Sequence, residues 1–249
     1  MIKDYWTKAS SDYSDLIDEE MQKSYKDKWL NFILDEIKDL EGPLEILDIG
    51  TGPGFFPLIL SSKDRHLTGI DLTEAMIDEA QKKLQAFHVD ADLFIMDCQE
   101  TTFPDQKFDC IICRNLVWTL PDPEKAYREW FRILKPGGRL LIFDGSWYIH
   151  HFDPSAKEKY QALKDYVKKT YDIDVYPYGD KETNPDDYEL MKITFLSDKA
   201  RPAWDEKTLT SLGFTVDKVL EDYLDFLVGK EERLARGDIS PVFFIKASK

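Results

Sequence analysis

Cysteine, histidine and long apolar runs are all scarce in this sequence. Of its 249 residues, three are cysteine and four are histidine. An odd number of cysteines, Cys98, Cys110 and Cys113, makes no disulfide framework. No apolar stretch approaches the ~18 residues of a membrane-spanning helix, and the N-terminus lacks the apolar core of a signal peptide. We therefore expect a cytoplasmic protein that has no membrane partner.

Positive charge is also in deficit. The chain has 33 Lys and Arg against 48 Asp and Glu, which gives a formal net charge of −15. Such a surface repels phosphate backbones and anionic lipids, so nucleic acid is not an expected partner. Hydrophobic residues make up 43% of the chain, which is enough for a core. The length fits one α/β domain with a modest insertion and leaves the oligomeric state open.

The spacing of Cys110 and Cys113 invites a metal-site or thiol interpretation. Both cysteines fall in an apolar run, residues 108–113, that is typical of a strand. Residues three apart in a strand point to opposite faces, so these two thiols cannot chelate one ion from there. We predict two buried cysteines and no metal site.

Short apolar segments alternate with amphipathic ones after a helical stretch of about forty residues. This alternation is typical of βαβ units that build a mostly parallel sheet. Thr73 can cap a helix whose N3 position is Met76. Pro136-Gly137-Gly138 is expected to stop a helix over 123–134 as a C-terminal cap. The predicted strands are 44–49, 67–70, 93–96, 108–113 and 139–143.

The pattern changes after residue 145. Aromatic residues are dense from Gly145 to about Trp204, which predicts a helical insertion over the carboxyl-terminal edge of the sheet, and 215–220 and 242–247 resemble a final antiparallel pair. We predict an α/β fold: a doubly wound, Rossmann-like, mostly parallel seven-stranded sheet with an antiparallel last strand and a helical cap insertion. The single domain, 1–249, would comprise an N-terminal helical segment (1–43), a cofactor-binding core (44–146), the cap (147–205) and the rest of the sheet (206–249).

A glycine turn, Asp48-Ile49-Gly50-Thr51-Gly52-Pro53-Gly54, follows the first predicted strand. Glycines let a backbone approach a ligand closely and place helix amides beside it. The dinucleotide fingerprint requires a third glycine three residues after the second, and this chain has Phe55 there. Glycine at every second position therefore favours an uncharged or zwitterionic ligand over a pyrophosphate.

Two further carboxylates end the next two predicted strands. Asp71 lies 21 residues after Gly50, where it can accept hydrogen bonds from both hydroxyls of a ribose. Asp97 ends the third strand, within reach of an exocyclic amine on a purine. The turn, the ribose acceptor and the base acceptor would share the sheet edge at which open α/β folds bind ligands.

With these motifs the sequence resembles the class I methyltransferase family, in particular the large branch that includes the ubiquinone-biosynthesis type. The matching segments are 44–54, 69–76, 94–98 and 108–138, the last of which reads FDCIICRNLVWTLPDPEKAYREWFRILKPGG. The resemblance is strong over residues 44–146 and covers the tail only in outline. It implies S-adenosylmethionine as the cofactor, S-adenosylhomocysteine as its product, and transfer of a methyl group to a small-molecule acceptor.

The resemblance also assigns roles to the cofactor-facing residues. Asp48 would hold the methionine ammonium, directly or through water, while Asp71 would bind the ribose hydroxyls. Asp97 would accept from the adenine amine, with Leu72 and the Cys98 backbone at the ring. Asn115 and Leu116 would border the methyl group, and the N-terminal aromatic segment would fold over the cofactor. The predicted cofactor-binding set is Tyr13, Asp48, Gly50, Thr51, Gly52, Gly54, Asp71, Leu72, Met76, Asp97, Cys98, Asn115 and Leu116.

Simpler interpretations stand beside these roles. The three carboxylates could merely cap turns or helices, although an acid that ends an apolar strand is costly to bury without a partner. On the same sheet, an NAD-type oxidoreductase or a non-catalytic cofactor-binding protein is the alternative. Whether oxygen, nitrogen, carbon or sulfur is methylated stays open.

The predicted cap supplies the candidates for the acceptor site. His150 and His151 follow the fifth strand and could act as a base, although surface histidines are more common. Aromatic faces suit a flat or cationic small molecule. We predict that these two histidines, together with some of Trp147, Tyr148, Tyr176 and Tyr178, border a cavity shared with Gly50 and Asn115.

Overall fold

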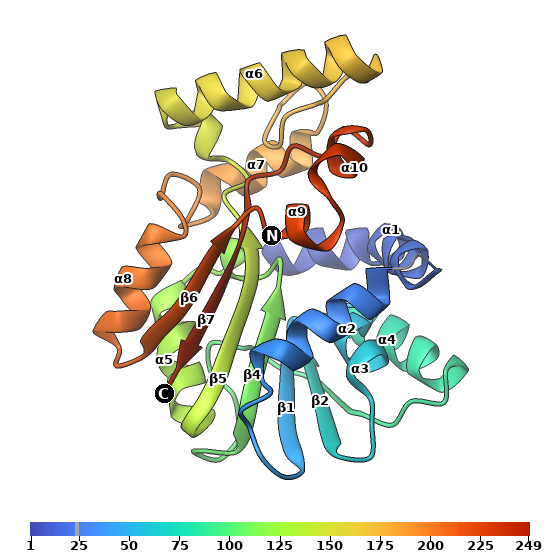
Figure 1. Cartoon of the computed structure of the whole chain (residues 1–249), viewed down its shortest axis with the longest axis vertical. Helices are drawn as coiled ribbons and strands as arrows, with labels where there is room; N and C mark the ends of the chain where they lie inside the picture. Colours follow the sequence, from blue (N-terminus) through green and yellow to red (C-terminus); the bar gives the residue numbers. More distant parts are fainter. Residues whose placement is uncertain (23–24) are drawn as a thin grey trace.

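A computed structural model of the chain describes residues 1–22 and 25–249. A seven-stranded sheet forms its centre, in the order β3-β2-β1-β4-β5-β7-β6 (Figure 1). The first five strands pair in parallel, whereas β7 runs antiparallel to both β5 and β6. The predicted fold class is therefore confirmed. The strands are β1 (Leu44–Ile49), β2 (Arg65–Asp71), β3 (Asp92–Ile95), β4 (Phe108–Arg114), β5 (Leu134–Gly145), β6 (Thr215–Glu221) and β7 (Val242–Ser248).

Helices cover both faces of the sheet and its carboxyl-terminal edge (Figure 1). Thr73 caps α4 as expected, because its side chain accepts a hydrogen bond from the Met76 amide. Two short helices between β6 and β7 were not predicted, since five residues give too little periodicity to detect. The α-helices are α1 (Ile2–Gln22), α2 (Tyr25–Glu36), α3 (Phe55–Leu60), α4 (Glu74–Ala86), α5 (Pro123–Ile133), α6 (Pro154–Tyr171), α7 (Pro185–Ile193), α8 (Ala203–Ser211), α9 (Tyr223–Leu227) and α10 (Lys230–Leu234).

The glycine pair after α5 does not cap that helix, so this prediction was wrong. Helix α5 ends at Ile133, and Leu134 is already extended and paired with Phe108 of β4. The glycines lie inside the long strand β5, where Gly137 has a φ of +77°. This left-handed backbone fits the register shift between β4 and β5 at that point.

The two faces of the sheet carry separate hydrophobic cores. One core packs β-strand side chains such as Cys113 against α5 and α8, including Trp130 and Leu209. The other packs Cys110 and its neighbours against α2, α3 and α9, around Trp29. The two cysteines are buried and face opposite sides, as predicted from the period of two in a strand.

Helices α6 and α7 lie beyond the carboxyl-terminal ends of the strands, at the top of Figure 1. Helix α1 packs against α4 and, in the view of Figure 1, lies below α6 and α7. The order of the strands reverses between β1 and β4, which places the crevice of an open α/β sheet at the ends of these two strands. The helices above the sheet therefore enclose the place where such folds bind ligands.

A buried network of ion pairs and hydrogen bonds holds the loop after β4 in place. Arg201 donates to Asp144 at the end of β5 over 3.0 Å and to both oxygens of Asp205 over 2.8 and 2.9 Å. Asp144 also accepts from the Trp118 amide over 3.1 Å, and Tyr127 donates to Asp205 over 2.6 Å. The three charged side chains have at most 1% of their surface exposed. The network ties the loop after β4 to α8.

Removing the cation from this network should be costly. Replacement of Arg201 by Ala leaves two buried carboxylates without a counter-ion, so we expect Arg201→Ala to lower the free energy of unfolding by about 3 to 5 kcal/mol. Urea denaturation measures the loss. The control is Arg128→Ala on α5, which breaks an exposed pair with Glu124 and should cost less than about 1 kcal/mol. Equal losses in the two variants would contradict the account.

Candidate functional site

The glycine turn after β1 takes backbone conformations that favour glycine. Gly50, Gly52 and Gly54 have φ values of +67°, +51° and +87°. A Cβ built on Gly50 would lie 2.9 Å from Leu116, and one built on Gly52 would lie 3.5 Å from the ring of Tyr13. The turn therefore passes closely between the loop after β4 and helix α1, and a side chain at Gly50 would displace Leu116.

Asp71 joins the end of β2 to this turn. Its Oδ2 accepts from the Gly52 amide over 3.2 Å, and its Oδ1 accepts from both the amide and the hydroxyl of Thr73 over 2.9 Å. Burial raises the pKa of Asp71, and the hydrogen bonds oppose that rise. Because Thr73 caps α4 itself, Asp71 is not the cap of that helix, and its carboxylate borders a cavity.

Asp48 lies behind the turn with 2% of its surface exposed. Its Oδ2 has no hydrogen-bond partner among the described residues. Burial raises the pKa of this carboxyl from 3.8 to about 7, although the Thr51 side chain and, to a smaller extent, Arg114 favour its charged form. A buried acceptor without a protein partner is unusual and is available to a ligand donor or a water molecule.

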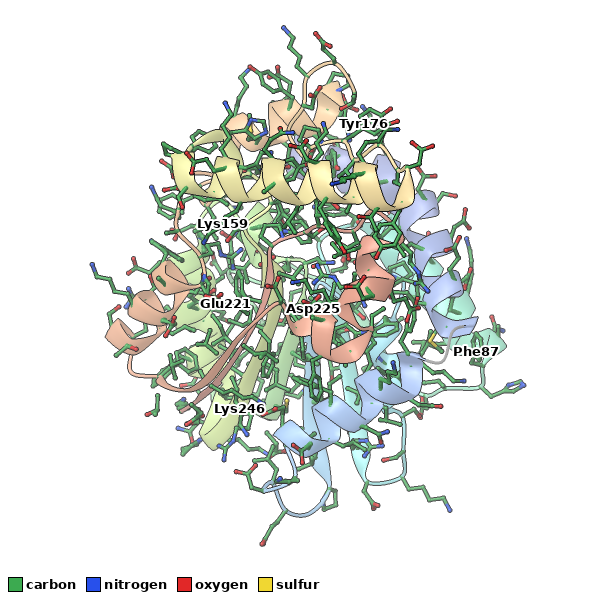
Figure 2. All side chains as sticks on the ribbon, turned by 45° about the horizontal axis from the view of Figure 1, so that its top comes forward. Phe87, Lys159, Tyr176, Glu221, Asp225 and Lys246 are labelled. Carbon is green, nitrogen blue, oxygen red and sulfur yellow. The ribbon has the colours of Figure 1, made fainter. Side chains whose placement is uncertain are left out.

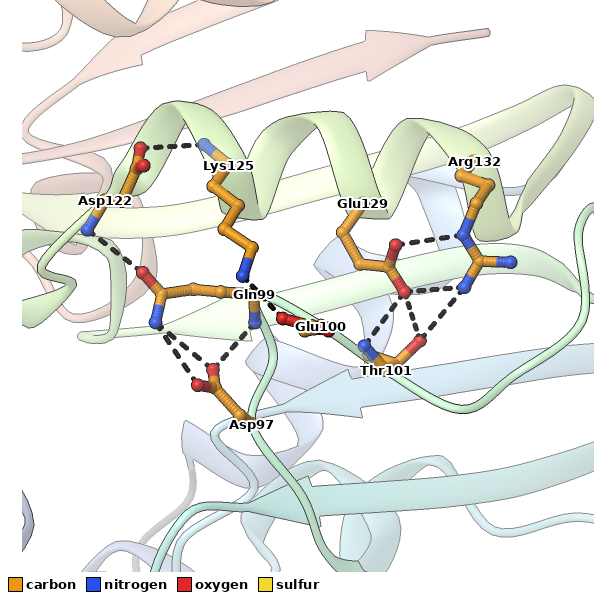
Figure 3. Close-up of polar contacts among 8 residues, drawn as sticks. All are labelled: Asp97, Gln99, Glu100, Thr101, Asp122, Lys125, Glu129 and Arg132. Carbon is orange, nitrogen blue, oxygen red and sulfur yellow. Dashed lines mark hydrogen bonds and ion pairs between the residues drawn. The ribbon is translucent and has the colours of Figure 1, made fainter.

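Asp97 sits on the exposed rim beyond β3. Its carboxylate accepts from the amide and the side chain of Gln99, whose own oxygen accepts from the Asp122 amide (Figure 3). Lys125, which Figure 3 places on the neighbouring α5, pairs with Glu100 rather than with Asp97. The Asp97 carboxylate is thus oriented by the backbone amide and the side chain of Gln99, and it keeps lone pairs available for a ligand.

Asn115, directly after β4, has a left-handed backbone with a φ of +54°. Its amide donates to Phe143 of β5 over 2.8 Å, and its carbonyl accepts from the Trp118 indole over 3.0 Å. Its side-chain oxygen is buried without a partner in the described part of the chain. Non-glycine residues held in this region of φ/ψ space cluster at functional sites.

A cavity of about 940 Å³, including its open mouth, collects most of these groups. It lies over the crevice between β1 and β4 and is covered by α1 through Ile2, Lys3 and Trp6. Of the predicted set, Asp48, Thr51 and Gly54 do not line it, because they lie behind the turn. The predicted residues that line this first cavity are Tyr13, Gly50, Gly52, Asp71, Leu72, Met76, Asp97, Cys98, Asn115 and Leu116.

Sequence reasoning missed Arg114 at the end of β4. Its buried guanidinium pairs with Glu20 of α1 over 2.8 Å and lies over the rings of Trp29 and Phe55. Arg114 lines the first cavity together with its neighbour Asn115. Its position in the sequence could have indicated a role, because a charged residue that ends an apolar strand is costly to bury without a partner, as argued for Asp48.

A second cavity of about 1040 Å³, including its open mouth, adjoins the first, since Arg114 and Asn115 border both. Of the predicted cap residues, Trp147 and Tyr178 line this second cavity. Tyr148 is buried and donates to Asp187, and Tyr176 has 66% of its surface exposed. Part of the cap therefore reaches a cavity shared with Asn115, but not one shared with Gly50.

The structure does not bring the two histidines to either cavity. His150 lines a third cavity, with Lys159 and Glu221 on its walls (Figure 2), and its ring stacks on Tyr160. Burial and the neighbouring His151 lower its pKa to about 4, which makes it a weak base. His151 contacts the carbonyl oxygen of Tyr178 over 2.7 Å. Their catalytic role stays a prediction, and this geometry does not favour it.

The described part of the chain comprises residues 1–22 and 25–249. Within these residues, no group of three or more His, Cys, Asp or Glu side chains is placed to hold a metal ion. Nor does any helix in this part of the chain combine the length and apolarity needed to cross a membrane.

The comparisons with known proteins agree with this geometry. Residues 47–142 match the family model described as a methyltransferase domain. Phosphoethanolamine N-methyltransferase of Triticum aestivum is 28% identical over 209 residues, which cover 81% of this chain and 40% of that protein. Ubiquinone biosynthesis O-methyltransferase of Coxiella burnetii is 30% identical over 97 residues, which cover 39% of this chain and 42% of that protein.

This chain spans about two fifths of the length of these two relatives. Among solved structures, one described as SAM-dependent methyltransferases from Methanosarcina mazei has a TM-score of 0.58 at 23% identity. The alignment covers 84% of this chain and 94% of that one. At this identity the likeness shows the shared fold.

Asp48 gives a pH-dependent prediction. Its pKa is higher in the folded chain, so the folded state binds more protons between about pH 4 and 7 and loses stability as the pH rises through that range. Asp48→Asn removes this loss. Above about pH 7 the ligand-free variant should be more stable than the wild type, by at most about 4 kcal/mol.

Urea unfolding of the ligand-free protein at several pH values measures the difference, which should shrink toward about pH 4. Asp78→Asn, on the exposed side of α4, is the control. A gap between wild type and Asp48→Asn that does not change with pH would contradict the account.

Proposed function

We propose, from the membership of this chain in the class I S-adenosylmethionine-dependent methyltransferase family, that it transfers a methyl group from that cofactor to a small-molecule acceptor. One observation carries the proposal. The glycine turn, Asp71 and Asn115 come from three different strand ends, and all three border one cavity at the point where the strand order reverses.

The residues present fit the parts of this cofactor. The carboxylate of Asp71 suits the two ribose hydroxyls, because an ionised oxygen makes strong hydrogen bonds. Asp97 suits the adenine amine, with Leu72 and Cys98 on the wall of the same cavity. The unpartnered Oδ2 of Asp48 suits the amino-acid ammonium, through the glycine turn or a water molecule.

The chain's own contribution is positioning and exclusion of water. When bound, the cofactor supplies an electrophilic methyl group on a sulfonium. Helix α1 covers the first cavity, and Trp6 packs edge-to-face against Trp118 at a centroid distance of 6.2 Å. Arg114 and Glu20 tie the same helix to β4. In a methyl transfer, such enclosure and alignment do most of the catalytic work.

Several finer assignments belong to the same proposal. We infer that residues 44–146 form the cofactor-binding core, 147–205 a cap for the acceptor, 1–43 an N-terminal helical segment and 206–249 the remainder of the sheet. We also infer that the enzyme is cytoplasmic, and the net charge of −15 supports the expectation that it does not bind nucleic acid. Phe55, buried at the first turn of α3, gives no support to the oxidoreductase alternative, which needs glycine there.

The cofactor assignment predicts which ligand stabilises the protein. S-adenosylhomocysteine at a large excess over its Kd should raise the melting temperature, because it binds the native state alone. NAD at the same concentration should leave the temperature unchanged. A larger shift with NAD would overturn the assignment. A shift with S-adenosylhomocysteine but no turnover on any acceptor would favour the non-catalytic cofactor-binding alternative.

Asp71 should account for a large part of that affinity. Asp71→Ala removes two charge-assisted hydrogen bonds, so calorimetry should show S-adenosylhomocysteine binding weakened by about 2 to 4 kcal/mol. The variant also loses its bonds to Gly52 and Thr73, so its stability is measured separately.

Two controls isolate the ligand contact. Thr73→Ala loses one bond to Asp71 and the helix cap but keeps the carboxylate, and it should retain most of the affinity. Asp78→Ala, exposed on α4, should bind as the wild type does. If Asp71→Ala binds S-adenosylhomocysteine with the wild-type affinity, the role of Asp71 is only to hold the glycine turn and Thr73 in place.

A further inference from the structure

The second cavity meets the first at Arg114 and Asn115. Its far walls come from Trp147 and Tyr178 of the cap and from the segment 236–242 that leads into β7. A molecule held there therefore lies beside Arg114 and Asn115 at the end of β4, whereas Gly50 and Gly52 of the glycine turn line the first cavity and not the second. This is the position that an acceptor needs.

Among the residues that the structure describes, the charged side chains that border this second cavity are all paired. Glu20 pairs with Arg114 over 2.8 Å, and Asp238 pairs with Arg233 over 3.1 Å. Arg236 pairs with Glu232. An anionic group would therefore find no unpaired cation among the described residues of this wall, and a cationic group would find no unpaired carboxylate among them. The lining favours a ligand that enters without net charge.

Three polar atoms of the lining residues are buried without a partner in the described part of the chain. They are the side-chain oxygen of Asn115, the indole nitrogen of Trp147 and the hydroxyl of Tyr160. The amide oxygen accepts a hydrogen bond, the indole donates one, and the hydroxyl does either. A complementary ligand carries a donor for Asn115 and an oxygen for Trp147 or Tyr160.

The described residues of the same lining offer no general base. The two carboxylates are held in ion pairs, and burial raises the pKa of Tyr160 to about 12 and also raises that of Tyr178. A hydroxyl nucleophile needs a base to remove its proton, whereas a neutral amine attacks through its own lone pair. The geometry favours nitrogen over oxygen as the atom that is methylated.

We propose that the second cavity holds the methyl acceptor, and that this acceptor is a small amine, bound in its neutral form, which also carries an oxygen. An amino alcohol is the simplest example. The inference rests on the proposed function. The nitrogen lone pair forms the new N–C bond as the C–S bond breaks, and the electron pair of that bond remains on sulfur. The resulting ammonium then releases one proton to water.

The aromatic walls have a defined part in this reaction. Positive charge passes from the sulfonium to the nitrogen as the bond forms. The rings of Trp147 and Tyr178 lie edge-to-face with centroids 5.2 Å apart, and Tyr223 lines the same cavity. Aromatic faces attract such a cation without a formal negative charge. They therefore favour the transition state over the neutral amine.

The test measures binding and needs no turnover. Three probes of one shape are phenylethanolamine, styrene glycol and mandelate, which present an amine, a hydroxyl and a carboxylate on the same body. Each is titrated by calorimetry into the protein saturated with S-adenosylhomocysteine. Below the pKa of the amine, its affinity should rise about tenfold per pH unit, because its neutral form binds. The affinity for styrene glycol should not change with pH.

Variants identify the cavity. Tyr160→Phe keeps the ring and removes only the hydroxyl, whereas Trp147→Phe replaces the indole with a smaller phenyl ring and removes its N–H donor. Each should weaken phenylethanolamine binding about threefold to tenfold. The matched control is Tyr176→Phe, an exposed tyrosine of the same cap that Figure 2 shows away from the sheet. Its affinity should equal that of the wild type.

Three results would overturn the inference. The first is that mandelate binds as tightly as phenylethanolamine, and the second is that the affinity for phenylethanolamine does not depend on pH. The third is that Trp147→Phe, Tyr160→Phe and Tyr176→Phe all bind phenylethanolamine with the same affinity. Saturation with S-adenosylhomocysteine is verified first and by itself. If that ligand binds and the amine does not, the acceptor assignment fails while the proposed function stands. If S-adenosylhomocysteine itself does not bind, the proposed function fails.

Discussion

The hydrogen bond from the Gly52 amide to the partly buried carboxylate of Asp71 joins two strand ends into one site. It links the turn after β1 to the end of β2, and Asp71 holds Thr73 at the start of α4 as well. The turn needs glycine because its backbone is left-handed at three alternate positions. Without this link, Asp71 and the glycine turn would not share a fixed wall of the cavity.

Around this hydrogen bond, the buried polar groups are of two kinds, those with a partner in the chain and those without one among the described residues. Charges that serve the architecture are buried and fully paired, as in Arg201 with Asp144 and Asp205. Two side-chain oxygens are instead buried without a partner in the described part of the chain: Oδ2 of Asp48 behind the glycine turn, and the side-chain oxygen of Asn115, which lines both cavities. Because an unsatisfied buried group costs stability, these groups point to a bound ligand that supplies the missing partners. The contrast distinguishes the scaffold from the site.

The sequence predicted the fold and much of the first cavity because both depend on local patterns. The alternating apolar runs predicted the strands, and the acidic residues at or after the strand ends, Asp48, Asp71 and Asp97, were the predicted ligand-binding carboxylates. The two short helices before β7 and the ion pair of Arg114 with Glu20 escaped prediction. The pair joins residues 94 positions apart, and nothing in the local pattern announces its partner. His150 was placed beside the wrong cavity because its position depends on how α6 packs.

We propose that Asp71 and the glycine turn hold S-adenosylmethionine. A crystal structure of the chain with S-adenosylhomocysteine tests it most directly. The account predicts both ribose hydroxyls at hydrogen-bond distance, about 2.5 to 3.0 Å, from the Asp71 carboxylate, with the amino-acid end against the glycine turn. A ligand bound elsewhere, or in this cavity with its ribose remote from Asp71, would contradict the account.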